Sequence, residues 1–139
     1  MFRSRRLTVF ALGLALNLIW EPIHAVLFYK GLSEYHLVQF IALMLYAATV
    51  DGILIVMIDG IGAKIFLNKW KKYGATPLLF TIIAGVLIAA IIEEKALLLH
   101  QWEYTAAMPT VFGIGLSPLL QLATTGAFTF MIMKRMRHT

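Results

Sequence analysis

The sequence predicts an all-α polytopic membrane protein, an antiparallel bundle of four transmembrane helices that occupies the whole chain, residues 1–139, as one domain. Hydrophobic residues make up 60% of the chain and charged residues only 14%, which leaves too little polar surface to cover a soluble globule. The apolar residues also gather in runs of the ~20 residues that a membrane-spanning helix needs. Four such runs are residues 7–29, 37–58, 76–99 and 111–133.

The basic residues predict how these helices are oriented. Ten of the twelve Lys and Arg residues fall on one side of the predicted membrane, and the other side has only Lys30 and Lys95. Because basic loops are retained in the cytoplasm, we expect a multi-pass protein of the cell membrane with both termini cytoplasmic. Basic residues that flank apolar runs indicate orientation, so no nucleic-acid partner is expected.

The first run carries the residues that most need an explanation. Asn17, Glu21 and His24 are spaced i, i+4 and i+7, which places them along one stripe of a helix with Trp20 at its edge. An ionised carboxylate inside a membrane costs at least ~2.5–3.5 kcal/mol, so such residues usually have a partner or a task. Glu21 and His24 are therefore candidate catalytic residues, and Asn17 and Trp20 are candidate ligand-binding residues. We expect this run to be a retained helix and not a cleaved signal peptide.

The second run places Asp51 near the middle of the membrane, one helical turn and a residue after Tyr46. Gly52 beside the acid allows a neighbouring helix or a ligand to approach. Asp51 is the third candidate catalytic residue, and Tyr46 is a candidate for ligand binding. Asp59 lies near the cytoplasmic end, where we expect it to pair with Lys64.

The third run ends in two adjacent acids, Glu93 and Glu94, near the predicted outer interface. Adjacent residues point ~100° apart around a helix, so only one of the two is expected to face the bundle, and the sequence leaves open which one. Trp102 and Tyr104 follow in the next connection. Aromatic residues usually anchor helix ends at the interface, and these two are also expected to roof a cavity; all four residues are ligand-binding candidates.

The fourth run begins irregularly, and Pro118 within it predicts a kink. Ser117 and Gln121 belong to a polar stripe and complete the ligand-binding candidates. A serine-nucleophile triad is not predicted, because the sequence offers no convincing Ser–His geometry. No His pair has zinc-ligand spacing on one helix, and there is no cysteine, so no metal or other cofactor is expected.

Three short segments carry a resemblance to known families. Residues 17–21 (NLIWE), 102–109 and 113–121 resemble a group of small uncharacterised four-helix membrane proteins of bacteria and archaea. The N-x-x-W-E element of Asn17, Trp20 and Glu21 is similar to one in the integral-membrane meroterpenoid cyclases. That resemblance implies that Glu21 supplies acid chemistry to an isoprenoid. Small multidrug transporters also place one essential Glu in the first of four helices, but the strong charge asymmetry of this chain departs from the dual orientation of some of them.

Three functions follow from these observations. The first is binding of, or action on, a hydrophobic small molecule such as an isoprenoid or another lipid, with Glu21 as acid or cation stabiliser. The second is proton- or cation-coupled transport through Glu21 and Asp51. The third is an accessory role in a larger membrane complex. Membrane lipids are expected partners in each case, and either a homodimer or a larger assembly is compatible with the sequence.

Overall fold

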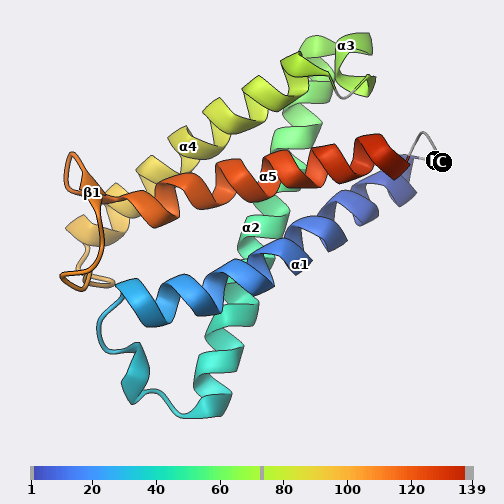
Figure 1. Cartoon of the computed structure of the whole chain (residues 1–139). Coiled ribbons are helices and arrows are strands. Elements are labelled where there is room, and N and C mark those ends of the chain that lie inside the picture. Colours follow the sequence, from blue (N-terminus) through green and yellow to red (C-terminus); the bar gives the residue numbers. More distant parts are fainter. Residues whose placement is uncertain (1, 73, 137–139) are drawn as a thin grey trace.

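Helices dominate the computed structural model, which describes residues 2–72 and 74–136 (Figure 1). Four helices are long and apolar enough to cross a membrane, which confirms the predicted all-helical class. They are α1 (Phe2–Phe28), α2 (Leu37–Phe66), α4 (Ala75–Leu98) and α5 (Leu116–Met136). The connections contain short elements: η1 (Leu32–Glu34), α3 (Asn68–Lys71), β1 (Thr110–Val111) and β2 (Ile114–Gly115).

Three of the long helices lie roughly alongside one another, and the fourth crosses them. Figure 1 shows α1, α5 and α4 side by side, with α2 passing behind at a steep angle. The helix α5 contacts both α1 and α4, and α2 contacts both α1 and α4. The first turn of α1 and the last turn of α5 lie at the same end of the molecule. Residues on α1, α2 and α5 can therefore meet where these helices cross.

Glycines bring the helix backbones close together. A Cβ added at Gly85 of α4 would lie 2.7 Å from the backbone nitrogen of Ala123 in α5. At Gly13 of α1 it would lie 3.4 Å from the Cα of Gly52 in α2. Small residues at such contacts allow the van der Waals packing that drives helix association in lipid.

The helix α2 is longer than predicted. The predicted span ended at residue 58, although the apolar run continues to Leu67, and the sequence left open whether the helix projects beyond the span or bends at Gly60 and Gly62; the helix continues through both glycines to Phe66. Trp70 of α3 then folds back onto α2 and is fully buried, and a Cβ added at Gly62 would lie 2.2 Å from its indole ring. Gly62 is therefore a docking position for a tryptophan and not a bend.

The helix α5 begins five residues later than the predicted start at residue 111, because residues 110–115 form a hairpin. Phe112 and Gly113 occupy its two-residue turn with φ of 51° and 82°, as a tight turn of the I′ kind requires. Pro118 consequently falls in the first turn of α5, where its missing N–H costs no helical hydrogen bond. Pro118 lies within the span as predicted, but the predicted kink has no preceding helical turn in which to form, because Ile114 belongs to β2.

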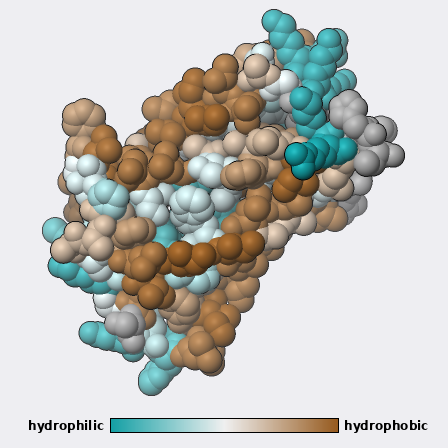
Figure 2. Space-filling model, viewed as in Figure 1, coloured by the Kyte–Doolittle hydropathy of each residue, from teal (hydrophilic) through white to brown (hydrophobic). Residues whose placement is uncertain are grey.

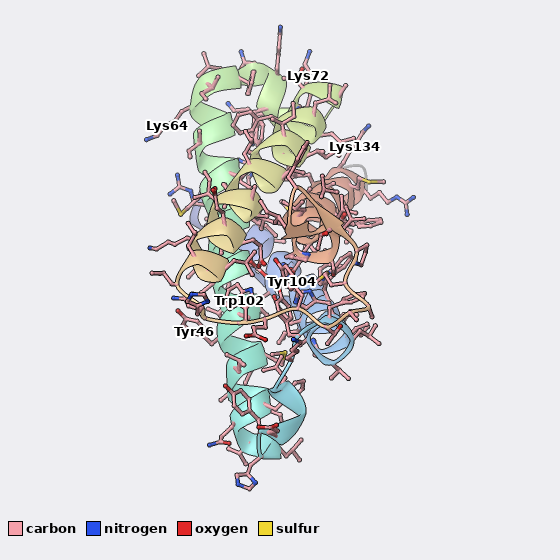
Figure 3. All side chains as sticks on the ribbon, turned by 90° about the vertical axis from the view of Figure 1, so that its left-hand side faces the viewer. Tyr46, Lys64, Lys72, Trp102, Tyr104 and Lys134 are labelled. Carbon is pink, nitrogen blue, oxygen red and sulfur yellow. The ribbon has the colours of Figure 1, made fainter. Side chains whose placement is uncertain are left out.

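Basic side chains gather at one end of the molecule. Lys64, Lys72 and Lys134 point outward at one end in Figure 3, whereas the labelled Trp102 and Tyr104 lie away from that end. The surface between is largely apolar (Figure 2).

Asp59 does not pair with Lys64 as predicted. Its Oδ1 accepts hydrogen bonds from Arg5 at 2.5 Å and from the indole of Trp70 at 2.8 Å.

Candidate functional site

The side-chain amide of Gln121 is the centre of a buried polar network. Its Nε2 lies 2.5 Å from Oε1 of Glu21, 2.7 Å from Oδ2 of Asp51 and 3.0 Å from Oδ1 of Asn17. These acceptors come from α1 and α2, so one residue of α5 joins three helices. An amide nitrogen has only two hydrogens, and the three acceptors therefore share them.

Asn17 holds this network in place. Its Nδ2 donates to the carbonyl of Gly13 at 2.9 Å and lies 3.2 Å from Oγ1 of Thr125, and its side chain is fully buried. Thr125 in turn donates to the carbonyl of Gln121. Every polar atom of Asn17 thus has a protein partner, which identifies it as a residue that positions Gln121.

His24 connects the network to the start of α5. Its Nε2 lies 3.3 Å from Oε2 of Glu21, one turn earlier on α1, and its Nδ1 lies 3.2 Å from Oγ of Ser117. A carboxylate at Nε2 favours the tautomer that carries its hydrogen there, which leaves Nδ1 free to accept the hydroxyl hydrogen of Ser117. The structure therefore forms the Ser–His–carboxylate chain that we did not predict from the sequence.

A groove between α1 and α5 lies against this chain. It encloses about 400 Å³, within the range typical of small-molecule sites. The residues that line it are Leu16, Ile19, Trp20, Ile23, His24, Phe28, Ser117, Thr124, Thr125 and Phe128. Ile19, Ile23 and Phe128 are at least half exposed, so the groove opens on the outer face of the helices. Figure 2 shows a paler strip of intermediate hydropathy there, flanked by apolar residues.

Only part of the predicted site reaches this groove. His24, Ser117 and Trp20 line it, whereas no carboxylate does so among the described residues. Glu21 lies behind His24, and Asp51 lies behind Gln121. The side chain of Trp20 contributes a donor that is still free, because its buried Nε1 has no hydrogen-bond partner.

Glu93 forms a second buried cluster on α4. It accepts hydrogen bonds from Tyr29 at 3.2 Å, from the indole of Trp102 at 3.2 Å and from the hydroxyl of Tyr104. Burial, together with the bond to Glu93, raises the pKa of Tyr104, so its phenol stays protonated and donates. Glu94 is exposed. The structure thus answers which acid faces inward, and Trp102 and Tyr104 close over Glu93 rather than over the groove.

Tyr29 joins the two clusters and was not predicted. Its ring contacts that of His24 edge-on, with centroids 5.1 Å apart, and its hydroxyl reaches Glu93. A tyrosine at the end of an apolar run is typical of an interfacial anchor, so no signal in the sequence marked it. Tyr46, which we did predict, is 69% exposed on α2 and lies outside both clusters (Figure 3).

Residues 2–72 and 74–136 contain no group of three or more His, Asp and Glu side chains arranged to hold a metal ion. Comparison of the chain with protein-family models, with curated proteins and with solved structures found no match.

Proposed function

We propose that this protein binds a hydrophobic small molecule, an isoprenoid or another lipid, in the groove between α1 and α5 and acts on it through His24 and Glu21. The observation that carries the proposal is that His24 makes two contacts at once. Its ring lines an apolar groove that opens on the outside of the helices, and it also contacts the buried carboxylate of Glu21. A histidine that contacts a buried carboxylate therefore borders a space of ligand size.

The proposal gives different tasks to the two groups. His24 is the titratable side chain in contact with the groove, so it exchanges a proton with the ligand. Glu21 orients the imidazole and balances its positive charge. This differs from our expectation that Glu21 itself is the acid, and it makes Gln121 and Asn17 the residues that hold the carboxylate in place.

The lipid environment favours entry from the side. Ile19, Ile23 and Phe128 border the groove and are exposed on a surface that faces acyl chains when the four helices span a bilayer. A ligand with an apolar chain can then enter from the membrane without crossing water. The surface that such a ligand meets in the groove is almost entirely apolar, which suits an acyl or isoprenoid chain.

Photocrosslinking tests ligand binding. The purified protein in liposomes is irradiated with an isoprenoid that carries a diazirine, and the labelled residues are located by mass spectrometry. We expect labels on the parts of α1 and α5 that line the groove. Thr124→Phe places an aromatic ring in the groove. We expect it to weaken ligand binding about tenfold, which corresponds to about 1.4 kcal/mol.

Leu87→Phe is the matched control, because Leu87 is 58% exposed on α4 and does not line the groove. It should label like the wild type. Equal labelling of both variants would show that the ligand does not occupy the groove.

A second candidate is proton-coupled transport, favoured by the approach of Glu21 and Asp51 to one amide group. Two carboxylates this close repel each other, so they readily share one proton, as a proton carrier requires. Proteoliposomes with an imposed pH gradient and an internal pH-sensitive dye test this function. If the protein transports protons, the imposed gradient should drive a flux that Asp51→Asn abolishes. The absence of flux under any gradient would rule out this function.

A further inference from the structure

The chain of Ser117, His24 and Glu21 contains the groups of a serine acyl-transfer site. We propose that Ser117 is a nucleophile that accepts the acyl group of a neutral lipid ester, with His24 as its general base and Glu21 as the positioning residue. The inference rests on the proposed function, because the ester must first enter the groove between α1 and α5. It goes further by naming the reaction and the atom that reacts.

The distances support the pairing of nucleophile and base. Oγ of Ser117 lies 3.2 Å from Nδ1 of His24, and Nε2 of the same ring lies 3.3 Å from Oε2 of Glu21. Both are at the long end of hydrogen bonding, as is common before a substrate tightens a catalytic site. The two ring nitrogens are used in the opposite sense to chymotrypsin, but the roles are the same, and such triads are recognised by geometry and role.

The groove determines the class of substrate. Its walls are apolar side chains such as Leu16, Ile23 and Phe128, and the residues that line it include no Lys or Arg. A phosphate headgroup would therefore find no cation in the groove, whereas a long acyl chain finds apolar contacts along α1 and α5. These features favour an ester of a long-chain fatty acid with an uncharged alcohol.

The proposed reaction has two steps. Oγ of Ser117 attacks the ester carbonyl carbon while its proton passes to Nδ1 of His24. The carbon–oxygen bond to the alcohol then breaks, and the alcohol leaves with that proton. Water attacks the acyl-serine, gives its proton to His24, and Oγ leaves and recovers the proton. One ester and one water become one fatty acid and one alcohol.

Two features near Ser117 stabilise the oxyanion that forms in each step. Ser117 lies in the first turn of α5, where the helix dipole is positive; the N–H of Leu116 is already donated to the carbonyl of Pro109 and Pro118 has none, so the dipole is the contribution of these residues. Trp20 lines the same groove, and its buried Nε1 has no partner. A rotation of the indole as the ester enters brings this N–H toward the carbonyl oxygen, as a transition-state donor requires.

A fluorophosphonate with a long alkyl chain tests the nucleophile directly, because it forms a stable adduct with an activated serine. Wild-type protein in liposomes should take up one label, located on Ser117 by mass spectrometry. Ser117→Ala should lose the label, while Ser33→Ala, the same change elsewhere in the chain, should keep it. His24→Gln should slow labelling by about 100-fold or more.

Glu21→Gln separates positioning from folding. It should strongly slow labelling of Ser117 by the fluorophosphonate, while the diazirine isoprenoid still crosslinks to the groove. A misfolded variant would lose both signals. Crosslinking without any fluorophosphonate adduct would overturn acyl transfer and leave the proposed ligand site standing. An adduct that persists in Ser117→Ala would also overturn it, and the absence of both signals would overturn both proposals.

Discussion

Replacing Gln121 by leucine removes the donor that joins α1, α2 and α5. The amide Nε2 lies within hydrogen-bond distance of a side-chain oxygen of Glu21, Asp51 and Asn17, at 2.5, 2.7 and 3.0 Å. Leucine has a similar volume but no polar atom, so the change deletes hydrogen bonds without creating a large cavity. Asn17 and Glu21 remain buried, Asp51 remains half-buried, and all three lose their common partner.

The expected loss follows from the number of hydrogens on the amide. Two hydrogens make at most two full bonds, and Glu21 holds the shortest. A bond to a charged group contributes ~1.5–3 kcal/mol and a neutral one ~1 kcal/mol, so the free energy of unfolding should fall by about 3 kcal/mol. Two ordinary hydrogen bonds between membrane helices, at ~0.6 kcal/mol each, would give only about 1.2 kcal/mol. The measured value therefore distinguishes a charge-assisted network from neutral packing.

The assay is reversible unfolding in mixed micelles as the fraction of SDS is raised, followed by circular dichroism. Gln101→Leu is the matched control, since Gln101 is exposed and the same atoms are removed. Its unfolding free energy should change by less than about 0.5 kcal/mol. Gln121→Leu with a loss near that of the control would refute the view that this amide holds the site together.

Three further predictions concern other parts of the fold. Gly85→Ala should destabilise the protein by about 2 kcal/mol, because its Cβ meets the backbone of α5; Gly60→Ala, with nothing within 4 Å, should stabilise it slightly in the same unfolding assay. Glu93→Gln should lose about 2 kcal/mol, and Glu94→Gln almost nothing. The chain has no cysteine, so Phe112→Cys should react with an impermeant maleimide on intact cells, whereas a cysteine in the basic loop before α4 should react only after permeabilisation; the opposite pattern would invert the proposed topology.

The helices were predictable because their signal is local. Apolar runs of sufficient length identify a membrane span whatever lies beside them. The boundaries were less predictable where a distant residue or a turn decides them. The apolar run of α2 continues to Leu67, but whether it bends at the glycines was decided by Trp70, which packs against Gly62; α5 starts late because Phe112 and Gly113 adopt a tight turn.

The polar residues around Gln121 were predictable from the sequence, but their pairing was not. Helical spacing placed Asn17, Glu21 and His24 on one stripe, and the structure keeps them together. Spacing cannot show which residue of another helix lies at the same depth. The contacts of Gln121 with Asp51 and of Tyr29 with Glu93 depend on how the helices cross, and no local pattern encodes this.

The same reasoning explains why the pairing of Ser117 with His24 escaped prediction. The two residues are 93 positions apart, and their contact depends on where α5 begins. With a start at residue 111, Ser117 would lie in the second turn of a helix kinked by Pro118. Because the hairpin delays the start to Leu116, the proline and the serine both fall in the first turn, beside the last turns of α1. A hairpin of six residues thus sets the geometry of the proposed nucleophile, and changes in its turn should alter fluorophosphonate labelling before they alter the stability of the four long helices.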